Sequence, residues 1–363
     1  MQILPNLNGG GVERGTLEVA RYLVEQGCES VVISAGGRMV SQLEAEGSRH
    51  VPWDLGKKSL LTLRHVHPLR RWLQREKPDI VHLRSRLPAW IAWLAWRKLP
   101  QAQRPGLVTT VHGLYSVSPY SAIMTRGERV IAVSETIRHY IAANYPKTDM
   151  NLVRLVYRGI DPQDFPFGYQ PDDQWLSQWR QQFPQLAGKK IITLPGRLTR
   201  LKGHHNFIDL ISALKRDNRQ IHGLIVGGED PKRRQYARDL RARIDTEGLA
   251  ADISFTGDRK DIRDIYAVSD VVLSLSTKPE SFGRTSLEAL AMGVPVVGYD
   301  HGGVGEILAA LYPQGRMPLG DQEALLGCVK AVLGGEAKPA GNDRFYKEDM
   351  VAKTLAIYRE LRP

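Results

Sequence analysis

Residues 278–297 read KPESFGRTSLEALAMGVPVV, and this stretch decides the fold. An apolar run over Val271–Leu275 precedes it, and a second apolar run over Val294–Gly298 closes it. Between the two runs the chain turns at a glycine, and the apolar spacing over Thr285–Met292 is typical of a helix. Strands that are joined by a helix lie parallel in one sheet. The stretch therefore predicts an α/β fold built on a parallel sheet.

The same alternation of short apolar strands and amphipathic helices runs along the whole chain. The other predicted strands are Val31–Ser34, Ile80–Leu83, Leu107–Val111, Val130–Val133, Ile191–Leu194, Gly223–Val226 and Ile253–Thr256. The other predicted helices are Val12–Gln26, Leu63–Glu76, Glu135–Asn144, His205–Lys215, 233–247, Glu323–Leu333 and Lys347–Leu361. Two such sets predict two doubly wound, Rossmann-like domains that face each other across a cleft, each a parallel sheet with helices on both faces.

Prolines and glycines between residues 161 and 173 interrupt both periodicities and place the domain boundary there. We expect a first domain over residues 1–165 and a second over 166–346, with a last helix at about 347–363 that packs on the first domain. The first strand, Gln2–Leu4, is shorter than the five residues that are usual for an internal strand. Either this strand is short or the chain starts late.

Composition and charge narrow the class of protein. The chain has 363 residues, of which 42% are hydrophobic, and only two cysteines, so we expect a protein of the reducing cytoplasm without a disulfide framework. It lacks a long apolar span and a secretory leader pattern. The net charge is +11, of which residues 1–165 carry +8. A basic half indicates an anionic partner, such as nucleic acid, a phospholipid surface or a phosphorylated substrate.

Two glycine-containing loops follow predicted strands. Asn8–Gly15 opens the first helix with three consecutive glycines, which is either an anion-binding loop or a mobile turn. In the second domain, Leu194–Gly203 carries Arg197 and Lys202 directly after a strand. Ligands of doubly wound folds bind at the carboxyl ends of strands. Two cations there suit a diphosphate, although isolated basic residues are more often solvated surface.

Two glutamates flank the glycine turn of the opening stretch. Glu280 stands at the strand exit, and Glu288 lies about two turns into the helix. Carboxylates in one cleft can accept hydrogen bonds from sugar hydroxyls. The alternative is a capping role for Glu280 and a solvent-exposed position for Glu288.

Taken together, these motifs resemble those of the family-4 retaining glycosyltransferases of the GT-B fold. The resemblance rests on Gly196-Arg197-Leu198-x-x-x-Lys202-Gly203, on Glu280-Ser281-Phe282-Gly283 and on Glu288-Ala289-x-Ala291-x-Gly293-x-Pro295-Val296-Val297. Shorter matches occur in family order at residues 10–14, 111–113, 133–135, 227–229 and 301–306. The set covers most of the chain, and members that assemble the lipopolysaccharide core are the ones it most resembles.

The resemblance implies a donor site in the second domain. Arg197 and Lys202 would bind the donor diphosphate, Glu280 would lie against the transferred sugar, and Glu288 would hold the nucleotide ribose. Backbone groups near the diphosphate and sugar would come from four further residues: Gly196, Ser281, Phe282 and Gly283.

In the first domain the resemblance assigns His112 to positioning the sugar and the acceptor, with a structural strand-end histidine as the alternative. Gly10 and Gly11 would approach the diphosphate, and Gly257 would meet the nucleobase. The implied reaction moves a sugar, from a UDP-sugar in the first instance, to a bacterial glycan or glycolipid with retention of configuration. The resemblance implies neither a cofactor nor a metal.

The segment 88–98 places Trp90, Trp93 and Trp96 three residues apart, followed by two cations. This pattern is typical of a buried helix, or alternatively of a bilayer interface. A cluster of cations is harder to attribute to a core: Lys57, Lys58, Arg64, Arg70, Arg71 and Arg75. We therefore hypothesise that the first domain faces an anionic acceptor, the inner face of the cytoplasmic membrane, or both.

Other functions fit the sequence less well. A nucleic-acid-binding protein would be basic, but no recognisable binding motif is present. A dehydrogenase would need the dinucleotide fingerprint that this chain lacks. Capsule or exopolysaccharide transferases, a sugar-nucleotide epimerase of the same architecture and a catalytically silent sugar-nucleotide binder remain as alternatives.

Overall fold

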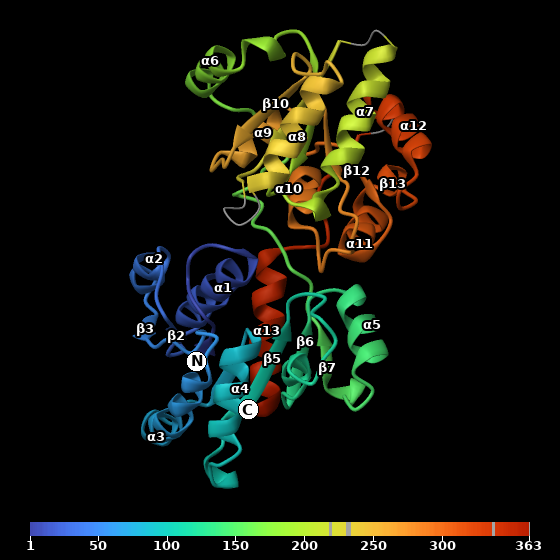
Figure 1. Ribbon diagram of the computed structural model, residues 1–363. Helices are drawn as coiled ribbons and strands as arrows, with labels where there is room; N and C mark the ends of the chain where they lie inside the picture. The colour runs from blue at the N-terminus through green and yellow to red at the C-terminus, as the bar shows by residue number, and fades with distance from the viewer. Residues whose placement is uncertain (218–219, 230–233, 336–337, 363) are drawn as a thin grey trace. The chain divides into compact units, whose positions relative to one another are not determined.

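The computed structural model describes residues 1–217, 220–229, 234–335 and 338–362 (Figure 1). The chain divides into two compact units. Unit 1 contains Met1–Arg158 and the last helix, and unit 2 contains Gly159–Tyr346. Each unit is built around one parallel sheet, which confirms the predicted fold class.

Unit 1 has a seven-stranded sheet in the order β3-β2-β1-β4-β5-β6-β7. Its strands are β1 Gln2–Ile3, β2 Val31–Ser34, β3 Arg49–Pro52, β4 Ile80–Leu83, β5 Gly106–Val111, β6 Arg129–Ala132 and β7 Val153–Leu155. The first strand is short but central, because it pairs in parallel with both β2 and β4. The backbone N–H of Leu4 still donates to Ile33, which extends the contact by one residue.

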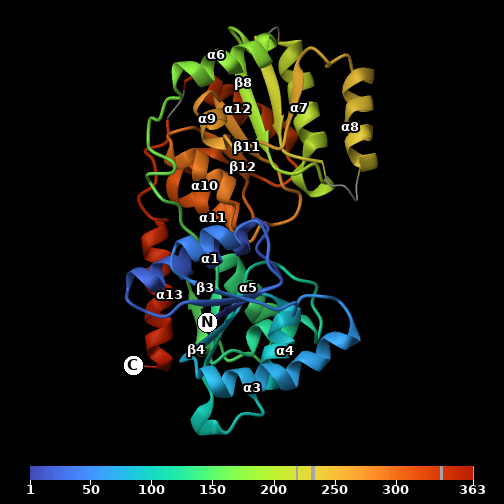
Figure 2. The same ribbon diagram turned by 90° about the vertical axis from the view of Figure 1, so that its left-hand side faces the viewer.

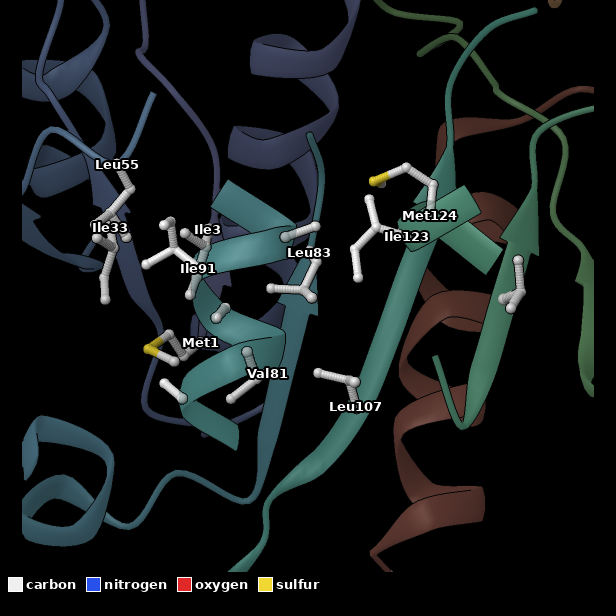
Figure 3. Close-up of a cluster of buried hydrophobic side chains, with 14 of the residues drawn as sticks. Met1, Ile3, Ile33, Leu55, Val81, Leu83, Ile91, Leu107, Ile123 and Met124 are labelled. Carbon is white, nitrogen blue, oxygen red and sulfur yellow. The ribbon is translucent and has the colours of Figure 1, made fainter. Parts of the chain in front are cut away.

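Alternating strand residues divide the core of unit 1 into two layers. Ile3, Ile33, Val81 and Leu83 pack against the helices on one face, where Figure 3 shows them around Ile91. The helices of this face are α3 Val66–Glu76, α4 Arg86–Trp96 and α5 Glu135–Asn144. The other face is covered by α1 Gly11–Glu25, α2 Val40–Ala45 and α13 Lys347–Leu361.

The last helix belongs to unit 1 although unit 2 precedes it in the chain. Buried residues of α13, among them Leu355 and Tyr358, pack against strand residues of β4, β5 and β6. The hydroxyl of Tyr358 lies 2.6 Å from His82 Nδ1, and the other ring nitrogen of His82 lies 2.6 Å from Thr110 Oγ1. The helix therefore completes one face of the first sheet.

The tryptophans of α4 pack within unit 1. Trp90, Trp93 and Trp96 are partly buried against the core, and Ile91, Ala92 and Ala95 between them are fully buried. The indole N–H groups of Trp90 and Trp96 donate to the backbone carbonyls of Tyr120 and Pro105. The packed-helix interpretation of this segment therefore describes the structure.

Unit 2 has a six-stranded sheet in the order β10-β9-β8-β11-β12-β13. Its strands are β8 Lys190–Pro195, β9 Ile221–Val226, β10 Ile253–Gly257, β11 Val271–Ser274, β12 Val296–Tyr299 and β13 Arg316–Met317. Its helices are α6 Asp173–Gln182, α7 His204–Arg216, α8 Arg234–Thr246, α9 Ile262–Ala267, α10 Arg284–Ala291, α11 Gly302–Leu311 and α12 Gln322–Leu333. Residue 233, where a helix was predicted to begin, lies outside the described residues.

Some predicted boundaries are wrong for identifiable reasons. The predicted helix Leu63–Glu76 is a 3-10 turn, η1 Leu60–His65, followed by α3. The last predicted strand begins at Val296 rather than Val294, because Pro295 has no N–H to donate to a neighbouring strand. The strands β7 and β13 carry too few residues to show a pattern, and β3 has only exposed and half-buried residues, which give no apolar run.

Both sheets share the strand order 3-2-1-4-5-6, with one further strand in unit 1. The direction of winding reverses between β1 and β4 in unit 1, and between β8 and β11 in unit 2. Ligands of such folds bind outside the carboxyl ends of the strands at this reversal. The loops after β1, β4, β8 and β11 are therefore the places to look for a site. Within the described ranges, none of the helices is long and apolar enough to cross a bilayer.

Candidate functional site

The loops after β8 and β11 bring Lys202 and Glu280 together. Their side chains form an ion pair, with Lys202 Nζ 2.6 Å from Glu280 Oε1. Lys202 lies in the 3-10 turn η6 Arg200–Lys202, which contacts the end of β11 through a backbone bond from Thr277 N to Leu201 O. About a quarter of each side chain is exposed, 27% for Lys202 and 23% for Glu280. The pair is therefore fixed by the backbone and open to a ligand.

Three neighbours keep Glu280 ionised. Burial alone would raise the pKa of its carboxyl, but Lys202, Ser276 and His301 together outweigh burial and hold the pKa below its ordinary value. The hydroxyl of Ser276 donates to Glu280 Oε1, and His301 Nε2 lies 2.7 Å from the Ser276 carbonyl oxygen. The carboxylate is thus a fixed acceptor that can receive hydrogen bonds from hydroxyl groups of a ligand.

Glycines hold the Glu280–Gly283 loop against the start of α11. A Cβ on Gly302 would lie 2.7 Å from the Glu280 carbonyl oxygen, and Gly303 donates its backbone N–H to the same oxygen at 2.8 Å. A Cβ on Gly303 would come within 2.3 Å of Phe282 Cα. Phe282 itself is buried, while Ser281 is half-buried. Only glycines at 302 and 303 allow this close approach.

Gly196 and Arg197 follow β8 directly. Gly196 has φ of +138°, and a Cβ there would press on the Lys202 side chain at 3.1 Å. Arg197 is exposed, and its neighbour Leu198 is buried and donates its N–H to the Gly228 carbonyl. Arg197 therefore leaves the same strand end as Lys202, with its guanidinium in solvent.

Glu288 is buried rather than solvent-exposed. It lies in α10 with 5% exposure, accepts a hydrogen bond from Tyr266 at 3.3 Å, and lies 3.7 Å from Arg284 Nε. The exposed-helix alternative for Glu288 is therefore wrong. A buried carboxylate that is held by an arginine and a phenol is fixed in orientation.

Gly257 ends β10 with φ of +73° and is exposed, and β9 lies between its strand and β8. The next residue, Asp258, is 3.3 Å from the position that a Cβ on Gly228 would take, and Gly228 accepts the backbone N–H of Leu198. The structure brings Gly196, Lys202, Glu280 and the Glu280–Gly283 loop together, and the loop after β9 lies between them and the loop that follows Gly257.

In unit 1, Gly10 and Gly11 begin α1 after the first strand. Gly10 is the N-cap and makes no side-chain capping bond, and a Cβ on Gly11 would meet nothing within 4 Å. The first N–H groups of a helix favour anions. The Glu13 carboxylate already lies at this helix start, since a Cβ on Gly10 would come within 2.6 Å of its Oε2, so the loop has open space at Gly11 but is not free of negative charge.

His112 follows β5 and is neutral. Arg158 Nη2 lies 2.5 Å from His112 Nδ1, and burial, Arg158, Arg84 and His82 lower the pKa of His112 well below its ordinary value. Since the guanidinium can only donate, the ring proton must lie on Nε2. His112 Nε2 is buried and has no hydrogen-bond partner in unit 1 or elsewhere in the described chain. The ring is thus prepared to donate one hydrogen bond, which suits positioning better than proton transfer.

Metal ligation has no support among the described residues. No group of three or more His, Cys, Asp or Glu side chains there is arranged to hold a metal ion. The cations at the loop after β8 are the groups available to an anionic ligand.

Sequence reasoning missed three supporting residues. Ser276 and Arg284 could have been found from their spacing, since each lies four residues before a glutamate of the site. No such spacing indicates Arg158, because it is 46 positions from His112 along the chain. Only the parallel sheet brings their strand ends together.

Comparisons with known proteins cover both units. The family model "Glycosyltransferase Family 4" matches residues 9–164, and "Glycosyl transferases group 1" matches residues 177–338. The lipopolysaccharide core biosynthesis mannosyltransferase LpsB of Rhizobium meliloti is 28% identical over 186 residues, which are 51% of this chain and 49% of that protein.

Solved structures resemble the whole chain. A glycosyltransferase from Rickettsia africae is 28% identical, with a TM-score of 0.84 over 99% of this chain and 97% of its own. The Anabaena protein HepE, solved with UDP-glucose, is 20% identical with a TM-score of 0.75 over 99% of this chain and 97% of its own, a similarity of fold. With both units matched by glycosyltransferase models and built on the predicted parallel sheets, this chain belongs to the glycosyltransferases of the GT-B fold and is similar to their family 4.

Proposed function

We propose that this glycosyltransferase moves a hexosyl group from a UDP-sugar to an anionic bacterial glycan or glycolipid, with retention of anomeric configuration. The observation that carries the proposal is the Lys202–Glu280 pair at the winding reversal of unit 2. It provides a cation for a diphosphate and a fixed carboxylate for sugar hydroxyls within one loop pair. UDP is the favoured nucleotide because HepE was solved with UDP-glucose.

Charge stabilisation and positioning carry the proposed chemistry. The bond from the anomeric carbon to the phosphate oxygen breaks, and the acceptor oxygen attacks from the same face. The acceptor proton passes to the departing phosphate oxygen, and a nucleoside diphosphate leaves. Arg197 and Lys202 stabilise the charge that grows on that phosphate. Glu280 and the neutral His112 orient the sugar by accepting and donating hydrogen bonds.

The remaining binding roles are divided between residues of unit 2 and residues of unit 1. In unit 2 we assign Glu288 to the ribose, with the backbone of Gly196, Ser281, Phe282 and Gly283 near the diphosphate and sugar. Gly257 would meet the nucleobase through its backbone. In unit 1, Gly10 and Gly11 would approach the diphosphate. The proposal includes neither a metal nor a cofactor.

The acceptor is proposed to carry negative charge and to belong to the lipopolysaccharide core. Residues 1–165 have a balance of +8, which favours phosphorylated sugars. The similarity to LpsB points to core assembly. A capsule or exopolysaccharide acceptor would use the same donor site. We place the reaction in the cytoplasm, at the inner face of the cytoplasmic membrane.

The decisive experiment is a donor panel. Thermal shifts with UDP-, GDP- and ADP-sugars should identify the donor, since a ligand of the folded state raises the melting temperature. Product analysis then tests the reaction: transfer needs the acceptor, and the anomeric proton coupling reports retention. If the protein converts the donor to its epimer when no acceptor is present, it is an epimerase rather than a transferase.

Arg197→Ala provides the matched test of the diphosphate assignment. We expect a loss of about a hundredfold or more in kcat, as for other preorganised charge contacts. Arg238→Ala removes an exposed arginine from α8 as a control and should leave turnover unchanged. Normal turnover in the Arg197 variant would contradict the assignment.

A further inference from the structure

A turn of unit 1 exposes its apolar residues and buries its polar one. In η1, Leu60 is 88% exposed, Leu61 70% and Leu63 49%, whereas Thr62 is only 4% exposed. No other four-residue stretch of the described chain has three large apolar side chains this exposed. A turn that faces only water would show the opposite arrangement. This leucine turn is therefore built to contact an apolar partner.

The leucine turn is held rigidly in this conformation. Thr62 Oγ1 donates to the Lys57 carbonyl at 2.6 Å, and Ser59 accepts from Leu61 N as the N-cap. Trp53 Nε1 donates to His65 Nδ1 at 3.0 Å, and this bond fixes the last residue of the turn. Because Thr62 is used inside the turn, the leucines must point outward. Their exposure is a consequence of the fold rather than of a loose loop.

Cations surround the leucines. Lys57 and Lys58 precede the turn and Arg64 lies within it, directly after Leu63, and no acidic residue occurs from residue 55 to residue 75. All three side chains are exposed. Among the residues that the structure describes, none of the three forms an ion pair with a carboxylate. The apolar surface is thus bordered by uncompensated positive charge.

The adjoining helix extends the basic surface. The turn leads directly into α3, which is labelled in Figure 2. Leu69, Trp72 and Leu73 occupy the buried face of α3, so Arg71 and Arg75 remain on its exposed side, where Arg75 is paired with Glu76 at 3.0 Å and Arg71 adds to the basic border. A protein surface that combines outward leucines with a basic border matches the interface of a bilayer with anionic headgroups.

We infer that residues 57–64 form a membrane anchor, in which Leu60, Leu61 and Leu63 enter the acyl boundary of an anionic bilayer and the flanking cations bind its headgroups. The charge of the border selects this occupant, because a second copy of the chain would bring the same positive charge to the contact. The anchor is independent of the donor site in unit 2. It places the membrane contact of the first domain at this turn rather than at the tryptophans of α4.

Vesicle flotation with the full chain tests the anchor. Vesicles of phosphatidylcholine alone are compared with vesicles that contain phosphatidylglycerol. The wild type should float with the anionic vesicles, and Leu60→Ser/Leu61→Ser/Leu63→Ser should reduce binding at least tenfold. Lys57→Gln/Lys58→Gln should lose about fivefold per charge and become less sensitive to salt, because fewer cations of the border remain. Leu319→Ser removes an exposed leucine, 54% accessible, from a loop of unit 2 and should bind like wild type.

Each outcome decides the inference. Equal flotation of the wild type and the triple-serine variant, or no preference for anionic vesicles, would overturn it. A change of oligomeric state in light scattering, with unchanged flotation, would assign the leucines to self-association instead. Transfer to a water-soluble acceptor should be the same in the triple-serine variant and the wild type. A failed flotation test therefore leaves the transferase proposal intact, and a failed donor panel leaves the anchor intact.

Discussion

Replacing Glu280 with glutamine should tighten the binding of UDP while it slows transfer. In the free protein, Lys202 Nζ lies 2.6 Å from Glu280 Oε1. A diphosphate oxygen that contacts the same ammonium at about 2.8 Å would lie within about 5 Å of the carboxylate oxygen. The carboxylate therefore competes with the diphosphate for Lys202 and also repels it.

The size of the effect follows from that distance. Two unit charges about 5 Å apart interact by about 3 kcal/mol at an effective dielectric constant of 20. Because about a quarter of both side chains is exposed, we expect solvent to reduce this repulsion to about 1 kcal/mol. Glu280→Gln should thus lower the Kd for UDP about fivefold. Its kcat should fall by about a hundredfold, because the amide is a weaker acceptor for the sugar hydroxyls.

Calorimetric titration with UDP measures the first effect, and initial rates measure the second. Lys202→Met should weaken UDP binding at least tenfold. Glu323→Gln removes an equal charge from the exposed first turn of α12 and should change neither quantity. The tightening should shrink as salt is added. Unchanged or weaker UDP binding by Glu280→Gln, or wild-type binding by Lys202→Met, would refute the shared role of the lysine.

Three further perturbations test other parts of the structure. Because burial and the neighbouring arginines hold the pKa of His112 well below its ordinary value, kcat/KM should show no step from this group between about pH 6 and 8, and Arg158→Met should raise the pKa of His112 while burial still lowers it. Gly302→Ala should lower the free energy of unfolding, measured in a urea melt, by about 1–3 kcal/mol and should reduce transfer. The reason is that the new Cβ would meet a backbone carbonyl at a residue with φ of +62°. Gly327→Ala is the control, because a Cβ there would meet nothing within 4 Å. Burial lowers the pKa of His204 to about 4 from 6.5, so the unfolded chain takes up the proton first as pH falls. The protonation of this residue should lower the free energy of unfolding by about 2 kcal/mol between about pH 7 and 5. In urea melts, His204→Gln should therefore lose less stability than the wild type over this pH range.

The fold could be predicted from the sequence because most of its strands are short runs of mainly apolar residues. Glu135–Asn144 and Lys347–Leu361 begin and end where their patterns predict. Edge strands such as β3 could not be predicted, because their half-exposed residues form no apolar run. The turn at Leu60–His65 was not predicted for a related reason, because Leu63 was counted toward the following helix although it faces outward.

The site could be predicted only in part. Lys202 and Glu280 lie 78 positions apart, yet each follows a strand at the winding reversal, so the topology brings them together. The burial of Glu288 depends on Tyr266, whose helix packs across from α10, and no local pattern indicates that contact. The protonation of His112 depends in the same way on distant arginines.

The position of α13 has a consequence for synthesis of the protein. The helix covers β4, β5 and β6 from the far end of the chain, behind roughly 190 residues of unit 2. At 5–20 residues per second, a ribosome needs about 10–40 s to deliver it. During that interval the nascent first sheet keeps apolar positions such as Ile80, Val108 and Ile131 uncovered. The half of the enzyme that leaves the ribosome first is therefore the half that is completed last.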